Sequence, residues 1–213
     1  MKKYTRYFAA AMAVTMVMGT FAGCSDKEKE GTASTASGDT FVMTLYPEIA
    51  PITCENFEKL VSDGFYDGLT FHRVVDDFMA QGGDPSGNGT GGSSENIKGE
   101  FAQNGVENNL SHQRGVVSMA RSNDMNSASS QFFICYTDCS FLDGAYAAFG
   151  EVTEGMEVID SFLKVERVYG ATGELSSPTS PITISKAVMI EEDAEGNPRV
   201  QFTMEDIPVS DAE

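Results

Sequence analysis

One stretch decides how the rest of this chain is interpreted: Phe71-His72-Arg73-Val74-Val75, followed by Phe78-Met79-Ala80-Gln81-Gly82-Gly83-Asp84. It places a permanently charged guanidinium inside an apolar, strand-like segment. On strand alternation Arg73 shares a face with Phe71 and Val75, so we expect its side chain to be half-buried. A half-buried charge costs free energy unless it has a partner or a use. Arg73 is therefore either half of a structural ion pair, with Asp76 or Asp77 as the candidate partner, or a functional group.

The bulk composition indicates one acidic domain with appendages. The 213 residues are 41% hydrophobic and carry 14 Lys+Arg against 32 Asp+Glu, a formal net charge of −18. A chain of this length can bury a sizeable core. The charge argues against binding to nucleic acid and against electrostatic adhesion to anionic lipid, because both require clustered Lys and Arg.

Residues 1–23 have the pattern of a secretion signal. Three basic residues open the chain, and an uncharged apolar run then extends from Phe8 to Phe21, too short to span a bilayer comfortably. The segment closes with Phe21-Ala22-Gly23-Cys24, which resembles the bacterial lipoprotein box, where the cysteine is lipidated and becomes the mature N-terminus. We therefore expect a lipid anchor at Cys24 on the extracytoplasmic face of a bacterial cell membrane. A freely secreted protein and an uncleaved anchor are the alternatives.

The remaining chain divides into a linker, a folded domain and a tail. Residues 24–39 contain no large apolar residue and predict a flexible tether, residues 40–191 predict the domain, and residues 192–213 predict an acidic tail in which 200–204 could add an edge strand. Strands are predicted over 41–46, 69–75, 78–81, 115–119, 131–136, 147–152 and 182–190, and helices from Pro51 to the residues before Gly64 and over 154–163. The glycine-rich residues 84–94 predict irregular structure. Short strands with two helices favour a mainly β fold, a closed eight-stranded antiparallel barrel capped by two α-helices.

The cysteines and histidines do not predict a metal centre. Cys54, Cys135 and Cys139 are an odd set after Cys24 is assigned to lipid, and we expect them to be structural, with the pairing of Cys135 and Cys139 left open. The chain has only two histidines, and no Cys/His cluster has metal-ligand spacing, so no metal or other cofactor is expected. The glycine-rich loop lacks the Gly-Lys-Ser/Thr ending of a phosphate-binding loop.

Six segments taken together resemble the cyclophilin family of peptidyl-prolyl isomerases, in the family's order and spacing, over about residues 40–191. They are Phe71–Val75, Phe78–Asp84, Gly89–Gly92, Val117–Ala120, Ser130–Ile134 and Phe141–Gly144. The resemblance implies a peptidyl-prolyl cis-trans isomerase, expected to be monomeric, that acts on proline-containing polypeptides without a cofactor.

The reaction explains why an arginine is needed. Rotation about an X-Pro bond must break amide resonance, against a barrier of roughly 18–20 kcal/mol. At the twisted transition state the prolyl nitrogen gains a lone pair, so a donor aimed at that nitrogen binds the transition state better than either planar ground state. The proposed donor is Arg73, and no general base is required.

The resemblance also implies the other site residues. Gln81 would fix the substrate carbonyl or the Arg73 side chain, Phe78 would grip the proline ring, and His72 would stand beside the pocket as a wall and hydrogen-bond partner. With Arg73 these form the expected catalytic set. The expected substrate-binding residues are Met79, Ala120, Arg121, Gln131, Phe133, Phe141, Leu142 and Tyr146.

Three of these positions depart from the common family pattern. Many members have Trp where this chain has Phe141 and His where it has Tyr146, and Arg121 replaces a common Asn. Loss of the indole N–H removes a donor often used to hold cyclosporin, which predicts weak inhibition by that drug. A second hypothesis is a proline-peptide-binding module or chaperone with little turnover. Arg73 favours the enzyme hypothesis, because a protein that only binds proline-containing segments has little use for a donor aimed at the prolyl nitrogen.

Overall fold

The computed structural model describes residues 39–209 apart from Thr172. The predicted signal segment and Cys24 lie outside these residues, as does most of the predicted linker. Within the described part, the longest helix has 12 residues, and no helix is long and apolar enough to cross a membrane.

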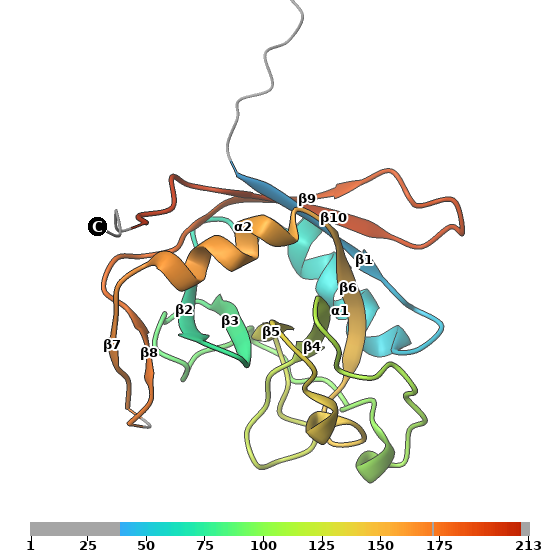
Figure 1. The fold of residues 1–213 in the computed structure, drawn as a ribbon. Coiled ribbons are helices and arrows are strands. Elements are labelled where there is room, and N and C mark those ends of the chain that lie inside the picture. The colour runs from blue at the N-terminus through green and yellow to red at the C-terminus, as the bar shows by residue number, and fades with distance from the viewer. Residues whose placement is uncertain (1–38, 172, 210–213) are drawn as a thin grey trace, which may run out of the picture. The chain divides into compact units, whose positions relative to one another are not determined.

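Eight strands form one antiparallel sheet in the order β2-β3-β5-β4-β6-β1-β10-β9 (Figure 1). Their bounds are β1 Thr40–Leu45, β2 Thr70–Val75, β3 Met79–Asp84, β4 Val116–Met119, β5 Phe132–Cys135, β6 Ala148–Glu154, β9 Ile184–Ile190 and β10 Arg199–Met204. The strands β7 Arg167–Tyr169 and β8 Leu175–Pro178 form a separate hairpin. The helices are α1 Pro51–Ser62 and α2 Met156–Ser161, with 3-10 turns at Ala102–Asn104 (η1), Ser140–Leu142 (η2) and Phe162–Lys164 (η3).

The prediction of a mainly β fold with two helices is confirmed. The prediction of a closed barrel is wrong as far as regular strand pairing is concerned, because β2 and β9 remain the two unpaired ends of the sheet. Between these ends lie one isolated bridge, Thr70 with Thr183, and a few backbone hydrogen bonds, including Phe71 N–H to the carbonyl of Ile182 at 2.9 Å. The sheet is therefore an open half-barrel whose ends touch at one point.

Two elements differ from the sequence expectation. Residues 199–204 are an interior strand, because β10 pairs with β1 on one side and β9 on the other, whereas the pattern predicted an edge strand in an acidic tail. The β7–β8 hairpin was not predicted, since strands of three and four residues show no usable alternation. This hairpin lies beside β2, at the end of the sheet that carries Arg73 (Figure 1).

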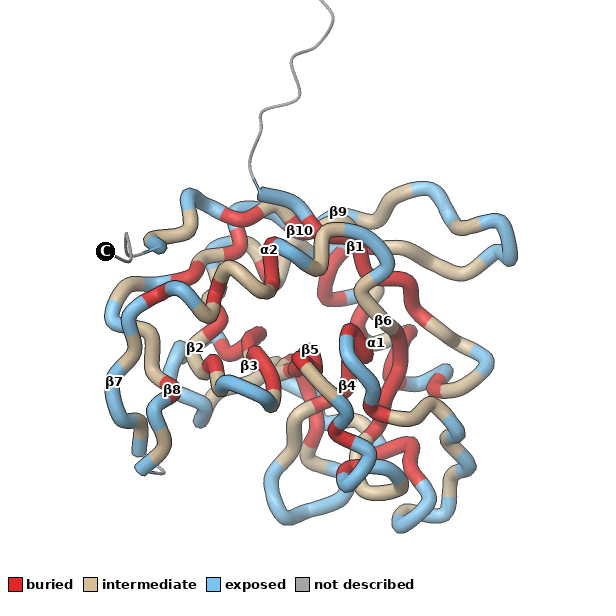
Figure 2. The backbone as a smooth tube through the Cα atoms, in the orientation of Figure 1, coloured by how far each residue is buried: buried red, intermediate tan, exposed pale blue. Residues whose placement is uncertain are grey.

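Aromatic side chains fill the space enclosed by the sheet and helix α1. Phe41 of β1 lies directly opposite Phe202 of β10, and their rings stack with centroids 4.9 Å apart. Phe57 of α1 packs edge-on against Phe132 of β5 at 5.4 Å. Buried residues follow the sheet strands and α1, while exposed residues gather in the connecting loops (Figure 2). Such burial of large rings is the main source of stability of this sheet.

Helix α1 begins at Pro51, as predicted, but its first turn is capped from another part of the chain. The N-cap residue Ala50 has no capping side chain. Instead the carboxylate of Glu100, which is 2% exposed, accepts hydrogen bonds from the N–H of Ile52 at 3.1 Å and from the N–H of Thr53 at 2.8 Å. An anion at a helix N-terminus also meets the positive end of the helix dipole. Ile52, an apolar residue of this first turn, is 41% exposed.

Candidate active site

A small hydrophobic cluster, separate from the main core, forms an open cavity of about 190 Å³ on the outer side of β3 and β5. One water molecule needs about 10–15 Å³ of such space, so this cavity has room for a group much larger than water. The lining residues are Arg73, Phe78, Met79, Gln81, Ala120, Arg121, Phe133, Leu142 and Tyr146. All nine were predicted from the sequence, and they come from distant parts of the chain.

Arg73 reaches this cavity because a β-bulge changes the alternation of β2. Phe71 pairs with Gly82 and Arg73 with Gln81, so two residues of β2 advance against one of β3. As a result Phe71 and Val74 both face the main core, and Arg73 lies on the other face with Val75, which packs against the small cluster. The expectation that Arg73 shares a face with Phe71 is wrong, since a bulge inserts one residue and reverses the faces beyond it.

The guanidinium of Arg73 has polar contacts with three neighbours and lies over the ring of Phe78, 5.7 Å from its centroid. Its Nη1 donates to Gln81 Oε1 at 3.3 Å and lies 3.8 Å from Met79 Sδ. Its Nε and Nη2 donate to one carboxylate oxygen of Glu174, at 3.1 and 2.7 Å. The side chain of Arg73 is 29% exposed, so the half-buried charge is compensated and still reaches the cavity.

Glu174 was not predicted as a partner of Arg73. It lies 101 residues further along the chain, at the tip of the β7–β8 hairpin. Of the two carboxylates considered from the sequence, neither bonds to Arg73: Asp76 pairs with Arg167 at 3.1 Å, and no ion pair of Asp77 is seen among the described residues. No local pattern could have indicated Glu174, because the pairing depends on where a remote hairpin folds back.

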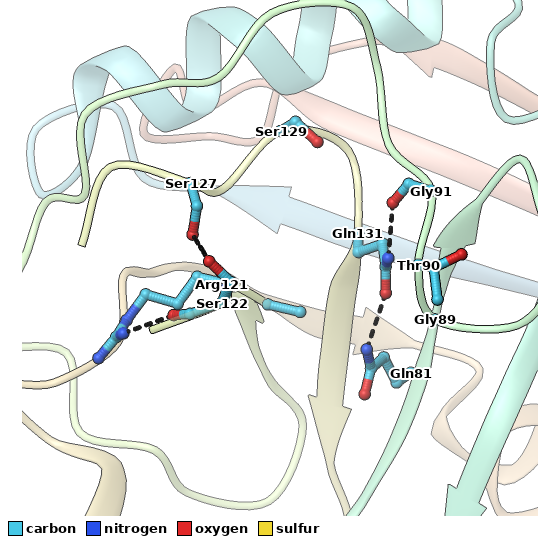
Figure 3. Close-up of a pocket in the computed structure, with 10 residues that line it drawn as sticks. Gln81, Gly89, Thr90, Gly91, Arg121, Ser122, Ser127, Ser129 and Gln131 are labelled. Carbon is cyan, nitrogen blue, oxygen red and sulfur yellow. Dashed lines mark hydrogen bonds between the residues drawn. The ribbon is translucent and has the colours of Figure 1, made fainter. Parts of the chain in front are cut away.

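A second cavity of about 240 Å³, whose lining is drawn in Figure 3, shares Gln81, Ala120 and Arg121 with the first. Gln81 Nε2 donates to Gln131 Oε1 at 2.8 Å, and Gln131 Nε2 donates to the carbonyl of Gly91 at 2.7 Å. This chain of amides fixes the orientation of both glutamines. Gln131 thus lines the second cavity and positions Gln81, which in turn contacts Arg73.

Arg121 separates the two cavities. Its Nε and Nη2 donate to the carbonyl of Ala145 at 3.1 and 2.9 Å, and its Nη1 donates to the carbonyl of Ser122 at 2.8 Å. The guanidinium lies over the rings of Tyr146 and Phe101, at 4.7 and 5.1 Å from their centroids. Each of its three nitrogens is engaged, so Arg121 contributes a fixed wall.

Asp84, which was not predicted as a site residue, organises the glycine-rich loop beside the second cavity. It is 1% exposed and accepts hydrogen bonds from the N–H groups of Ser86, Asn88 and Gly89 at 2.7, 3.1 and 2.6 Å. Burial works to raise the pKa of Asp84, but these backbone donors outweigh it and hold the pKa below its ordinary value. Gly91 faces Asp84 so closely that a Cβ atom would collide with the carboxylate. The sequence signal was the Asp-Pro-Ser-Gly turn at residue 84.

Two predicted residues lie elsewhere. His72 is absent from both cavities described above and lines a groove on the far side of Arg73, next to Gly87 and Gly89. Neither ring nitrogen has a hydrogen-bond partner among the described residues, and burial lowers the pKa of His72 so that the neutral ring is favoured. The expected role of His72 as a hydrogen-bond partner stays a prediction. Phe141 does not line the cavity either. Its side chain is 72% exposed, and its ring lies 5.7 Å from that of Phe78 at the rim.

A buried histidine supports the cavity from behind. His112 Nδ1 lies 2.7 Å from Asp143 Oδ1, its Nε2 lies 2.9 Å from Ser118 Oγ, and its ring stacks on Phe133 at 6.1 Å. Serine, histidine and aspartate are connected as in a hydrolase triad, but Ser118 is 0% exposed, so no substrate can reach its hydroxyl. We assign this group the structural role of holding Phe133 in place.

The buried thiols are also structural. Cys54, Cys135 and Cys139 are all free and buried, so Cys135 and Cys139 form no disulfide in this structure. Burial raises the pKa of Cys54 to about 12 and that of Cys135 further. A neutral thiol is a poor nucleophile, so these residues do not supply a covalent step.

The comparison with protein families identifies this combination of fold and cavity. The model of the family described as "Cyclophilin type peptidyl-prolyl cis-trans isomerase/CLD" matches residues 32–189. The chain belongs to the cyclophilin-type peptidyl-prolyl isomerase family, and it is a peptidyl-prolyl cis-trans isomerase.

Individual relatives of the chain support the same family assignment. The chain is 43% identical to peptidyl-prolyl cis-trans isomerase-like 1 of Neurospora crassa over 158 residues, covering 73% of this chain and 92% of the relative. It is 47% identical to peptidyl-prolyl cis-trans isomerase B of Bacillus subtilis over 120 residues, covering 56% and 80%. A crystal structure of a cyclophilin-type isomerase of Cryptosporidium parvum, determined in the presence of the dipeptide Ala-Pro, is similar with a TM-score of 0.61 and 29% identity, covering 70% of this chain and 94% of that one.

Proposed function

We propose that the 190 Å³ cavity binds the proline ring of a polypeptide and that Arg73 accelerates rotation of the preceding amide bond. The observation that carries this proposal is the direction of the guanidinium: Nη1 contacts Gln81 and Met79, which line the cavity. A donor there stabilises the lone pair that develops on the prolyl nitrogen as the bond twists. The similar protein from Cryptosporidium parvum, studied with Ala-Pro, supports a proline-containing ligand.

The energies required are modest. An acceleration of ~10⁴-fold needs a barrier lower by ~5–6 kcal/mol. Charge-assisted hydrogen bonds contribute about 1.5–3 kcal/mol each and are stronger away from water, and the apolar walls formed by Phe78, Met79 and Phe133 exclude water from one side of the substrate. A single guanidinium in this cavity therefore supplies a large share of the catalysis.

The test compares Arg73→Ala with Arg199→Ala, a control in which another half-buried arginine loses its ion pair, here with Glu154. Turnover of an Ala-Pro peptide, followed by NMR exchange spectroscopy, should fall about 10²–10³-fold for Arg73→Ala, the usual effect of removing one transition-state donor. It should stay within twofold for Arg199→Ala. Unchanged turnover in Arg73→Ala would exclude the mechanism.

A binding module that holds proline-containing segments is the second candidate function. One observation favours it: Glu174 already engages two nitrogens of Arg73, as would suit a groove that does not need a free donor. Tight peptide binding with no acceleration by the unmodified protein would support the module.

We also propose that the enzyme is tethered by lipid at Cys24 and assists the folding of exported or surface proteins. The support is the basic, apolar and cysteine pattern of residues 1–24. Intact-mass analysis of the full chain expressed in a bacterium should show loss of residues 1–23 and an added lipid mass at Cys24. A Cys24→Ala variant should leave the membrane fraction; a wild-type protein found free of membranes and without added mass would refute the anchor.

A further inference from the structure

The β7–β8 hairpin presents one carboxylate to Arg73, and the hairpin itself is firmly attached. At its base Arg167 donates from Nη1 to the carbonyl of Val74 at 3.2 Å and to Asp76 at 3.1 Å. Near its tip the carbonyl of Glu174 accepts hydrogen bonds from the N–H of Gly170 at 2.8 Å and from Ser176 Oγ at 3.2 Å. The base of the hairpin is therefore bonded to β2, β8 packs beside β2, and the backbone around Glu174 is ordered within the hairpin.

The contacts of Arg73 divide its guanidinium into two edges. Glu174 Oε2 accepts from both Nε and Nη2, which form one edge. The remaining nitrogen, Nη1, is directed to Gln81 and Met79. Glu174 does not line the cavity where the proline ring would bind, so its carboxylate does not occupy the substrate's place.

We propose that Glu174 is a positioning residue, which fixes the Nε–Nη2 edge of Arg73 so that Nη1 is held toward the cavity before the substrate arrives. This inference rests on the proposed role of Arg73 as donor. A free arginine side chain samples many rotamers, and a donor that is already ordered need not lose that freedom at the transition state. The β7–β8 hairpin is thus part of the catalytic apparatus.

Kinetics of three variants of the full chain test this role. Turnover of an Ala-Pro peptide by Glu174→Ala should fall about three- to tenfold, mainly in kcat, as expected for losing a half-exposed, two-nitrogen ion pair. Glu174→Gln should lose less, about two- to threefold, because its amide oxygen still accepts from the same edge. The control Glu195→Gln removes one negative charge from the exposed loop between β9 and β10 and should leave turnover unchanged. Equal melting temperatures of the variants would show that they fold.

A double variant separates positioning from a general structural role. In an Arg73→Ala background, Glu174→Ala should change the residual turnover by less than twofold, since nothing remains to be positioned. An equal fall in both backgrounds would overturn the proposal, and so would unchanged turnover in Glu174→Ala alone. A rise in turnover would show that Glu174 competes with the substrate, which also overturns it. If Arg73→Ala itself were fully active, the proposed mechanism would fail first, which is a different outcome.

Discussion

Replacing Asp84 by asparagine should loosen the glycine-rich loop and weaken substrate binding without abolishing the chemistry. The carboxylate is almost fully buried and holds three backbone N–H groups, those of Ser86, Asn88 and Gly89. Two residues further on, the carbonyl of Gly91 accepts from Gln131 in the second cavity. Asp84 is thus connected to the cavity wall through the loop that it orders.

The size of the effect follows from these bonds. Asparagine puts an NH2 group in place of one carboxylate oxygen, so in the less costly orientation the N–H of Ser86 loses its acceptor, while those of Asn88 and Gly89 keep a weaker one. Losing a buried hydrogen bond to a charged group costs about 1.5–3 kcal/mol, and the neutralised bonds add to this. We expect the free energy of unfolding to fall by roughly 2–4 kcal/mol.

Urea unfolding at pH 7 measures this loss, and hydrogen exchange of the three amides localises it. KM for an Ala-Pro peptide should rise more than kcat falls. Because the pKa of Asp84 is lowered in the folded protein, its contribution is present above the unfolded pKa of about 3.9 and is lost as pH falls through the folded pKa, so the parent and the variant should converge in acid. The control Asp193→Asn, which removes similar backbone contacts in a less buried turn, should lose less stability. An Asp84→Asn protein with parental stability and amide protection would refute this reasoning.

Three further outcomes are expected. Glu100→Ala should lower the free energy of unfolding by about 2 kcal/mol, because it removes the buried cap of helix α1, and an unchanged urea midpoint would contradict that role. The buried ring of His72 stays neutral in the folded protein, so only the unfolded chain takes up a proton as pH falls below about 6.5. The free energy of unfolding of the parent should therefore fall relative to that of a His72→Gln variant, by at most ~1.4 kcal/mol per pH unit. Parallel pH profiles of the two proteins would exclude this linkage. Cyclosporin should inhibit weakly because the exposed Phe141 has no N–H to donate, so a low-nanomolar inhibition constant would show that the indole is not needed.

The lining residues of the apolar cavity were predicted from the resemblance to the cyclophilin family, and four of the nine, Arg73, Met79, Gln81 and Phe133, lie in strands. Met79 and Gln81 of β3, and Phe133 of β5, project to one face by simple period-two spacing. The open sheet end and the interior position of β10 could not be predicted in this way, since they depend on which strands meet in space.

Two sequence-based expectations about Arg73, its face of β2 and its ion-pair partner, were wrong, each for a physical reason. A bulge between Phe71 and Arg73 reverses the faces of β2, and nothing in an apolar run marks where an extra residue is inserted. The ion-pair partner, Glu174, lies on a hairpin 101 residues further along the chain. A local sequence pattern can suggest only neighbouring carboxylates such as Asp76. Both features alter the surroundings of the arginine and leave its identification as the central residue unchanged.

The most direct measurement determines turnover and peptide affinity on the same sample of Arg73→Ala. NMR exchange spectroscopy gives the rate of cis-trans interconversion of an Ala-Pro peptide, and chemical-shift titration gives its Kd. If Arg73 acts on the twisted bond, the rate should fall by about 10²–10³-fold while Kd changes by less than about fivefold, because the apolar walls formed by Phe78, Met79 and Phe133 remain. A variant that binds the peptide and still turns it over at the parental rate would contradict the mechanism.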